Sequence, residues 1–287
     1  MIVRDIAGYS RARPSIADHP VVNTKDRQYR DLSAAFLCEG STFVDLMFNA
    51  TYRGRVSRVD RGAPRVPGGG NTMHLGMSAQ SAITFDCKSM FTDSAGLGSI
   101  VVVARPQRTW VSYYGTIFNQ GEVTDNEYTW AFAFSDVSSL AWSTNGFQSG
   151  IASSQIGGLW KPNYWNVVGC GKGGAFGENM DFFGNGLWDP RGNAAVGGAV
   201  QAIGAFGSGY LGGAVNPGTE YNGLLDVVYV FKRRLAYEDY MDFYNDPYRL
   251  IAMRPARPVW RVSGAAPPAS SYFRTGLVGT RRGSRSA

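Results

Sequence analysis

Two acidic residues in the sequence GENMDFF, Glu178 and Asp181, are the first candidates for catalysis. Glycosidases use a pair of carboxyl groups, one to protonate the leaving oxygen and one to attack or to activate water. Successive side chains of a strand point to opposite faces, so two residues at this odd spacing lie on opposite faces of one strand. The spacing disfavours a catalytic pair; we expect a turn carboxylate at Glu178 and a solvent-facing strand residue at Asp181.

Histidine and cysteine add little to this chemistry. His19 lies in a proline-flanked segment and His74 follows a GGGNT loop, so neither has an evident partner that would orient it in a Ser/His/Asp or Cys/His site. Cys38, Cys87 and Cys170 are far apart and lack metal-ligand spacing, which favours reduced core thiols over a disulfide or a metal site. The sequence therefore predicts that the protein is not an enzyme and holds no cofactor and no metal.

Asp226 stands within LLDVVYVF (224–231), a run that is apolar on both faces of a strand. A buried carboxylate can be a metal ligand, or it can accept hydrogen bonds from the adjoining loop or from Arg234. The second interpretation is favoured, because one acidic residue does not make a metal site.

Tryptophans suggest a binding function, since aromatic faces stack on pyranose rings and loops carry binding residues. Trp110, in QRTWVSYYG, and Trp142, in AWSTNG, are near turn signals and are the candidates for a carbohydrate site. The alternative is that both are core residues, as most aromatic residues of a β-sandwich are.

Positive charge is concentrated at the C-terminus. Seven of the 28 basic residues are arginines within 252–287, which hold no acidic residue, so the rest of the chain has 21 basic and 22 acidic residues. A partner surface rich in carboxylates would suit this segment better than nucleic acid, although phosphate contacts remain an alternative. The predicted partner-binding residues are its arginines and aromatic anchors: Arg254, Arg257, Trp260, Arg261, Tyr272, Phe273, Arg274, Arg281, Arg282 and Arg285. A second set, Arg53, Arg55, Arg58, Arg61 and Arg65, is interpreted as a solvated loop, with a basic patch as the alternative.

Short apolar runs bounded by glycine, proline, asparagine or aspartate predict a sheet protein. They include SIVVVARP (99–106), GTIFNQG (115–121), YTWAFAFSD (128–136) and YWNVVGCG (164–171), and Asn185-Gly186 in MDFFGNGLWD predicts a type I′ hairpin turn. After the central strand 224–231, Leu235, Tyr240, Phe243 and Tyr244 share one side of a short helix that Asn245-Asp246-Pro247 ends. The predicted fold is all-β: a two-sheet antiparallel jelly-roll sandwich (25–248) with one short C-terminal helix, an N-terminal arm (1–24) and an extended basic C-terminal arm (249–287).

These segments resemble, in order and over most of the chain, the concanavalin A-like (laminin G-like) jelly-roll proteins found among bacteriophage structural genes. The similarity includes an Asp-Leu-x-x-Asn-x-Thr turn in LSAAFLCEGSTFVDLMFNATYRG (32–54), the Asn-Gly hairpin and the terminal strand, helix and Asn-Pro-Tyr exit. In that terminal part the matching positions are Gly223, Asp226, Arg234, Leu235, Glu238, Asn245, Pro247 and Tyr248. The sequence departs from the pattern at Val227, where the family has Glu, and at Ala236, where Ser or Thr would cap the helix. The family's glucanase motif, Glu-x-Asp-x-x-Glu, is absent.

The resemblance implies a virion structural protein, assembled in the host cytoplasm and anchored by its arms to major capsid or tail subunits, as a homo-oligomer within the particle. Capsid decoration is the leading expectation, and a tail or fibre-associated carbohydrate-binding adhesin that contacts surface glycans is the alternative. Nucleic acid is not expected as a partner. A membrane is not expected either, because no run approaches about 18 apolar residues and MIVRDIAGYSRARP has no apolar signal core.

Overall fold

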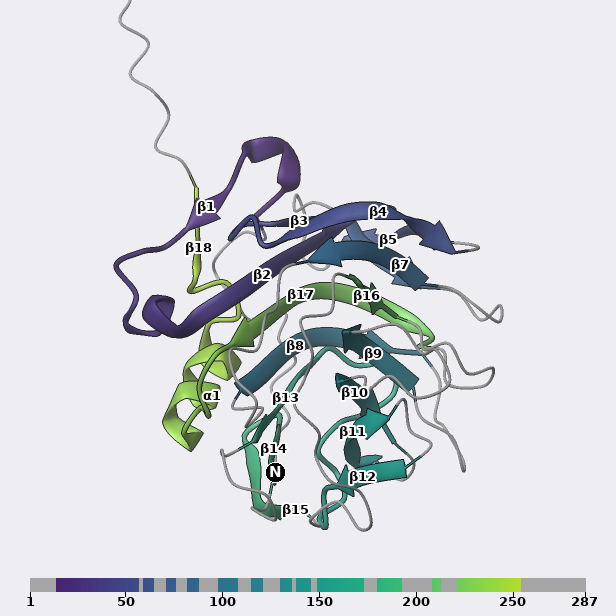
Figure 1. Cartoon of the computed structure of the whole chain (residues 1–287), viewed down its shortest axis with the longest axis vertical. Helices are drawn as coiled ribbons and strands as arrows, with labels where there is room; N and C mark the ends of the chain where they lie inside the picture. The colour runs from purple at the N-terminus through teal and green to yellow at the C-terminus, as the bar shows by residue number, and fades with distance from the viewer. Residues whose placement is uncertain are drawn as a thin grey trace, which may run out of the picture. The chain divides into compact units, whose positions relative to one another are not determined.

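A computed structural model of the chain shows two antiparallel β-sheets packed face to face (Figure 1). Contacts divide the chain into residues 1–254 and residues 255–287, and the second unit lies outside the described residues. The described residues are 14–56, 59–64, 71–75, 82–87, 98–107, 115–120, 130–135, 138–145, 149–172, 180–192, 208–212 and 221–253.

The larger sheet has nine strands and the smaller has seven. The nine-stranded sheet runs in the order β15 (Leu187–Gly192), β14 (Met180–Gly184), β13 (Asn166–Lys172), β8 (Gly98–Pro106), β17 (Gly223–Phe231), β2 (Leu32–Glu39) and β3 (Thr42–Asp45), with β6 (Asn71–Leu75) and β5 (Val59–Pro64) joined through β17. The seven-stranded sheet runs in the order β12 (Ser149–Ser153), β11 (Leu140–Asn145), β10 (Trp130–Phe134), β9 (Gly115–Gln120), β16 (Ser208–Leu211), β7 (Ala82–Cys87) and β4 (Ala50–Val56). No helix among the described residues is long and apolar enough to cross a membrane.

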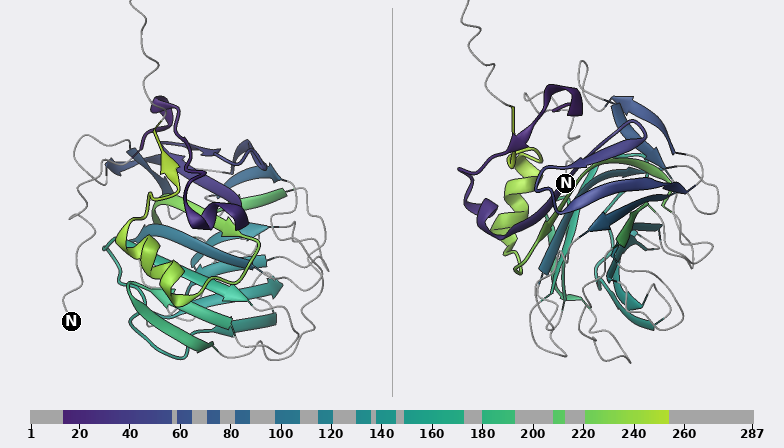
Figure 2. Two further views of the ribbon diagram at one scale, coloured as in Figure 1. Left: turned by 90° about the vertical axis from the view of Figure 1, so that its left-hand side faces the viewer. Right: turned by 45° about the horizontal axis from the view of Figure 1, so that its top comes forward.

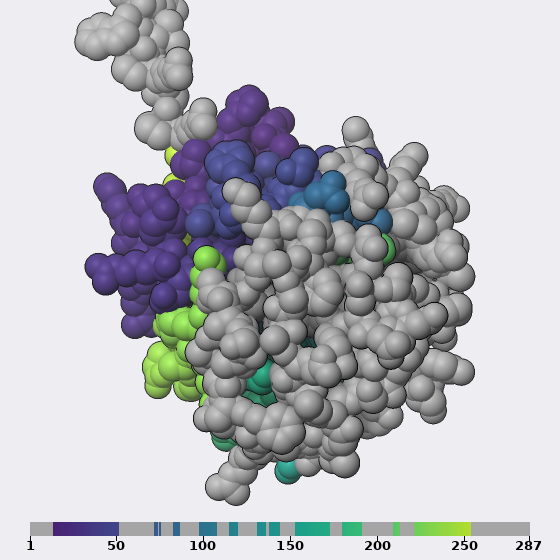
Figure 3. Space-filling model, in the orientation of Figure 1, coloured from purple at the N-terminus to yellow at the C-terminus, as the bar shows by residue number. Residues whose placement is uncertain are grey.

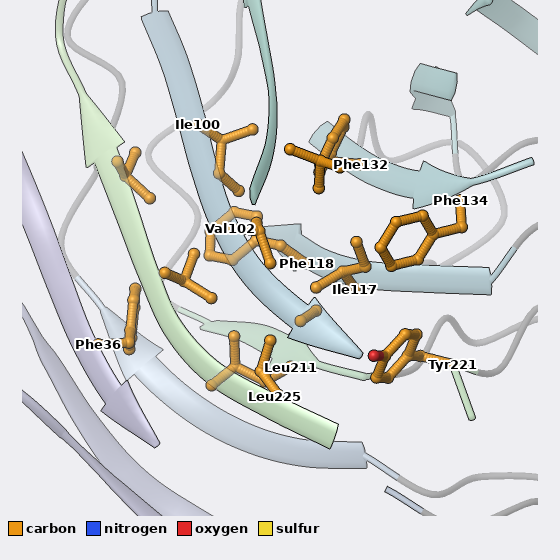
Figure 4. Close-up of a cluster of buried hydrophobic side chains, with 14 of the residues drawn as sticks. Phe36, Ile100, Val102, Ile117, Phe118, Phe132, Phe134, Leu211, Tyr221 and Leu225 are labelled. Carbon is orange, nitrogen blue, oxygen red and sulfur yellow. The ribbon is translucent and has the colours of Figure 1, made fainter. Parts of the chain in front are cut away.

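Apolar side chains from both sheets meet in one core, which Figure 4 shows in close-up. Phe36, Val102 and Leu225 point into it from the nine-stranded sheet, and Phe118 and Phe132 from the seven-stranded sheet. Alternation of core and outward residues along each strand produces this arrangement. The predicted two-sheet antiparallel jelly roll with one short helix is confirmed.

The Asn185-Gly186 hairpin is also confirmed. Gly184 pairs with Leu187, and both turn residues have positive φ, 50° at Asn185 and 89° at Gly186, as a type I′ turn requires. Asn185 also joins this turn to β13, because its side-chain oxygen accepts the backbone N–H of Val167 at 3.0 Å.

Strand β17 is buried on both faces, but its residues divide between the faces differently from a strict alternation. The pairing of β17 with β8 shifts between Leu225 and Val227, which leaves Asp226 in a β-bulge. Leu225 therefore shares the sandwich core with Val228 and Val230, whereas Val227 belongs to the opposite face. A strict two-residue period would place Leu225 and Val227 on the same face, because an inserted residue leaves no mark in a run that is apolar on both faces.

The opposite face of the nine-stranded sheet carries a second apolar layer, formed largely by helix α1 (Tyr237–Asn245), which lies across the strands (Figure 2). Tyr240 and Phe243 of the helix are fully buried, and Phe243 lies 5.1 Å from Tyr229 between ring centroids. Ala236 offers no side-chain cap, and its own N–H donates instead to the Asp239 carboxylate at 3.1 Å. The helix ends at Asn245, as the Asn-Asp-Pro sequence predicted.

The N-terminal residues of the described chain belong to the same layer, and Figure 3 shows them beside α1 on the surface. They form the 3-10 turns η2 (Ile16–Asp18) and η3 (Arg27–Asp31) and the strand β1 (Val21–Val22), which pairs with β18 (Ile251–Ala252). Arg249 binds Asp26 at 2.9 Å and Arg233 binds Asp31 at 2.7 Å.

This pairing corrects the predicted domain boundaries. Residues 14–24, expected in the N-terminal arm, and residues 249–253, expected in the C-terminal arm, are part of the folded unit. Short irregular segments of this kind are ordered by ion pairs and by strand pairing with distant residues, and neither leaves a periodic signal in the sequence.

The Asp-Leu-x-x-Asn turn has a structural explanation. The buried Asp45 carboxylate accepts four backbone N–H groups, those of Ala35, Met47, Asn49 and Ala50, at 2.7–3.0 Å. Asn49 in turn donates to the Ser33 carbonyl at 2.5 Å. The motif therefore fixes the turn between β3 and β4 to the neighbouring strand β2.

Candidate functional site

Of the two candidate catalytic carboxylates, Asp181 lies within the described residues. Asp181 is 2% exposed and its two carboxylate oxygens accept from Nε and Nη2 of Arg234, so the expectation that it faces solvent is wrong. Burial raises the pKa of Asp181, against the opposing effect of Arg234 and with a small addition from the charge of Asp189. The helix layer covers this face of β14, which the sequence around Asp181 does not reveal. Glu178 lies outside the described residues.

Asp226 is a hydrogen-bond acceptor. The Tyr248 hydroxyl, in the segment after α1, donates to its Oδ2 at 2.5 Å. Asp226 therefore accepts a hydrogen bond as expected, with Tyr248 as a donor, whereas Arg234, one of the expected donors, binds Asp181. Across the described chain, no group of three or more His, Cys, Asp or Glu residues is placed to hold a metal ion.

The structure describes the side chains of one histidine, His19, and of two cysteines, Cys38 and Cys170. His19 is exposed and ends η2 in the left-handed conformation. His74 lies on strand β6 rather than in a loop, and its side chain is outside the described residues, as is that of Cys87. Cys38 and Cys170 are buried free thiols, and burial raises the pKa of Cys170 well above its ordinary value.

Trp142 does not fit the role of a sugar-stacking residue. It is 1% exposed and points into the core between the sheets from β11, because turn signals nearby do not determine which face of a strand a side chain takes. Trp110 lies outside the described residues, as do all the predicted partner-binding residues of the basic tail.

The arginine-rich stretch contributes to two strands of different sheets rather than to the expected loop, since Arg53 and Arg55 lie on β4 and Arg61 lies on β5. The side chains of these three residues are outside the described part of the chain, as are Arg58 and Arg65 altogether.

A different candidate is the outer face of the seven-stranded sheet, the face that points away from the sandwich core. Paired residues on antiparallel strands share a face, and Phe118 pairs with the core residues Phe132 and Leu211. The next residues along each strand therefore face outward. They form a row across five strands, which we call the outer row: Thr84, Tyr210, Asn119, Ala131 and Ser143.

A second row beside the outer row contains Thr116, Ala133 and Ala141, which pair in that order. Residue Ile117 is the extra residue of a bulge, so Thr116 faces outward like Asn119 although the two are separated by an odd number of positions. Small side chains thus occupy the middle of this face, and Ala131, Ala133, Ala141 and Ser143 are buried at 0% exposure.

Buried polar atoms without a hydrogen-bond partner occur at several places in the described chain, among them atoms of Gln28, Ser33 and Tyr240 and, on this face, of Asn119 and Thr116. Both are 0% exposed, yet neither the amide nitrogen nor the amide oxygen of Asn119 nor the Thr116 hydroxyl has a hydrogen-bond partner. Each unsatisfied buried polar group costs about 1–3 kcal/mol. Such groups are rare in native proteins and call for an explanation such as a bound ligand or water.

Asn166 shows what a satisfied buried amide looks like in the same protein. It is also 0% exposed, but its oxygen accepts from Lys161 and Asn185 at 2.8 Å, and its nitrogen donates to the carbonyls of Lys161 and Tyr164. The unsatisfied amide of Asn119 is therefore a property of its place on the outer row and not of buried asparagines generally.

The outer row offers one aromatic ring beside these polar groups. Tyr210 is half-buried and pairs directly with Asn119. An amide donor and acceptor, a hydroxyl and a ring face on a floor of small residues suit an uncharged ligand rich in hydroxyl groups. The sequence predicted none of these residues as a site, although the alternation of alanine and aromatic residues in WAFAF signalled one face without bulky side chains.

No known protein family matches the chain, and no curated protein sequence matches it either. Several solved structures are similar to the chain. The binding domain of botulinum neurotoxin serotype G has a TM-score of 0.56 at 16% identity over 75% of this chain and 50% of its own, and that of serotype D has a TM-score of 0.53 at 12% identity over 77% and 53%. Domain 4 of AbnA, a GH43 extracellular arabinanase from Geobacillus stearothermophilus solved in complex with arabinotriose, has a TM-score of 0.51 at 15% identity over 75% of this chain and 98% of its own.

The chain spans about half the length of the neurotoxin domains that it matches and nearly all of the arabinanase domain. At these identities the likeness concerns the fold. The described chain is a β-sandwich of the jelly-roll type shared with these binding domains.

Proposed function

We propose that the protein is a non-catalytic carbohydrate-binding module, an adhesin that attaches its carrier to a glycan-bearing surface, and that the outer row and Thr116 form its binding face. The observation that carries this proposal is the set of buried, unpaired polar groups on Asn119 and Thr116. The similar domains whose names describe receptor binding or a complex with arabinotriose are in line with it.

A neutral oligosaccharide matches this face chemically. Its hydroxyl groups donate and accept hydrogen bonds, so one sugar ring can satisfy both amide atoms of Asn119 and the Thr116 hydroxyl at once. Its apolar ring face can lie against Tyr210, the half-buried member of the outer row. A charged ligand would bind this face less favourably, because the side chains of these two rows carry no charge to pair with it.

The absence of enzymatic activity is part of the proposal. Asp181 and Asp226, the acidic residues of the described chain that had been considered for chemistry, are engaged by Arg234 and Tyr248. A general acid or base must reach the substrate with a free carboxyl group. Release of reducing sugar by the purified protein, lost on Asp181→Asn or Glu178→Gln, would contradict this part of the proposal.

The test is a titration of the purified protein with a panel of neutral oligosaccharides, beginning with arabinotriose, followed by NMR or calorimetry. Asn119→Ala and Thr116→Val should each weaken binding about tenfold or more, since each removes hydrogen bonds made only in the complex. Thr42→Val is the matched control, because Thr42 is exposed on β3 of the other sheet. Binding that is unchanged in Asn119→Ala would contradict the proposed face.

The location on a virion, including the decoration role, is a second proposal that rests on the resemblance of the sequence to phage structural proteins. One structural observation favours attachment through the chain ends: the last described strand, β18, pairs with the first, β1. Deleting residues 255–287 should leave the sandwich folded, as judged by its melting temperature, and should abolish incorporation into particles. Normal incorporation of the truncated chain would contradict anchoring by the tail.

A further inference from the structure

The segment of residues 161–165 precedes β13, an inner strand of the nine-stranded sheet that does not carry the outer row. Its conformation is fixed from both sides. Asn166 holds the N–H and carbonyl of Lys161 and the carbonyl of Tyr164 at 2.6–2.9 Å, and the Asn163 N–H donates to the Pro106 carbonyl at 2.6 Å. A loop held by this many side-chain hydrogen bonds presents its exposed side chains in a defined arrangement.

Arg105, near the end of β8, is oriented by the same segment. Its Nε donates to the Asn163 carbonyl at 2.8 Å, so the two Nη groups are the donors of the guanidinium that this bond does not use. The described residues give Arg105 no carboxylate partner. Arg233, Arg234 and Arg249 differ in this respect, since each pairs with at least one aspartate.

Lys161 and Tyr164 complete the cluster. Lys161 is exposed and, within the described chain, has no ion-pair partner; Tyr164 is 54% exposed, an unusual position for a large aromatic side chain. Tyr164 is bonded directly to the carbonyl group of Asn163 that receives the Arg105 hydrogen bond. Two cations and an exposed ring therefore belong to one braced loop and the strand end that it contacts, and the described residues supply neither cation with a carboxylate partner.

We infer that Arg105, Lys161 and Tyr164 form a second binding site, separate from the outer row, that takes the carboxylate group of an acidic sugar. The planar guanidinium fork matches a carboxylate and binds it through two parallel hydrogen bonds, while the lysine adds a second charge. The exposed ring of Tyr164 supplies a surface for the sugar ring. The choice of a sugar as the carrier of the carboxylate rests on the proposed function; the carboxylate itself follows from the unpaired cations.

The site is tested by titrating the full chain with glucuronic acid, with glucose as the uncharged counterpart, and following the amide and side-chain NMR signals. Glucuronic acid should shift the signals of the 161–165 segment, glucose should not, and acetate should compete with glucuronic acid. Arg105→Gln should weaken glucuronic acid binding about tenfold or more, because it removes a charged, bidentate donor. Raising the salt concentration should weaken binding to the wild type, since exposed charges are screened.

Controls separate this site from the outer row and from loss of structure. Arg105→Lys keeps the positive charge but loses the planar guanidinium, so it should bind glucuronic acid with an affinity between those of the wild type and Arg105→Gln. Because Tyr164 is exposed, Tyr164→Ala should weaken binding without lowering the melting temperature. Asn119→Ala should leave glucuronic acid binding unchanged, and Arg105→Gln should leave neutral oligosaccharide binding unchanged. Equal binding of glucuronic acid by the wild type and by a folded Arg105→Gln protein, or binding by neither, would overturn the inference. If neutral oligosaccharides fail to bind but glucuronic acid binds, only the proposal for the outer row is contradicted.

Discussion

The outer faces of the two sheets are built from opposite kinds of residue. On the nine-stranded sheet the outer face is apolar and covered: Tyr229 and Phe231 pack under Phe243 of α1, and charged side chains around the helix are paired. On the seven-stranded sheet the outer face is made of small and polar residues, and Asn119 and Thr116 lie buried there without partners.

This difference separates stability from binding within one sandwich. Groups that are packed and hydrogen-bonded raise the free energy of unfolding. A buried polar group without a partner lowers it, and this cost is recovered only when a ligand supplies the missing hydrogen bond. The helix-covered face therefore has the properties of a structural layer, and the outer row has those of a surface adapted to a ligand.

The largest expected effect is on the covered face. Phe243→Ala should lower the free energy of unfolding by about 3–5 kcal/mol, because it removes a fully buried ring that packs between Tyr229 and Phe231. Urea unfolding followed by tryptophan fluorescence measures this change. Tyr237→Ala, on the exposed side of the same helix, should cost much less. Similar losses in the two variants would show that α1 is not a structural layer.

A smaller loss is expected when one buried hydrogen bond is broken. Tyr248→Phe removes the hydroxyl that donates to the buried Asp226 carboxylate at 2.5 Å, and should cost about 1–3 kcal/mol in urea unfolding. Tyr164→Phe removes the hydroxyl of an exposed tyrosine and should be neutral. A neutral Tyr248→Phe would mean that Asp226 has another donor of equal value.

The paired charges should make the covered face sensitive to acid. Burial by itself would raise the pKa of Asp239, but Arg233, the Ala236 N–H and Gln28 together hold that pKa below its ordinary value. Since the pKa is lower in the folded state, Asp239 stabilises the protein above the unfolded-state pKa of about 3.9, and this contribution is lost as pH falls through the folded pKa. Asp239→Asn should therefore cost about 1 kcal/mol at neutral pH, and its difference from the wild type should disappear in strong acid. A difference that is independent of pH would contradict this assignment.

The smallest change in stability is expected on the outer row. Asn119→Ala should alter the free energy of unfolding by less than about 0.5 kcal/mol or should raise it, because the amide it removes is buried without a partner. Asn166→Ala is the matched variant: the same substitution, at an equally buried asparagine with a full set of hydrogen bonds, should cost about 2 kcal/mol or more. Equal losses at the two sites would remove the distinction between the faces.

The sequence by itself determined the local features that depend on neighbouring residues. Alternating apolar runs predicted the strands, Asn185-Gly186 predicted the tight hairpin because few other residues adopt positive φ at both positions, and Asn245-Asp246-Pro247 predicted the end of the helix. It also indicated that Asp226 accepts a hydrogen bond, because a lone carboxylate in an apolar strand needs a donor.

Only the tertiary structure decided which face each side chain takes and which distant groups meet. The bulge at Asp226 moved Leu225 to the face of Val228, Trp142 turned into the core, and Arg234 bound Asp181 instead of Asp226. The outer row joins residues from five strands, and Arg105 lies 58 positions from Asn163. Such contacts depend on strand register and on the packing of one sheet against the other, and a local period in the sequence carries no information about either.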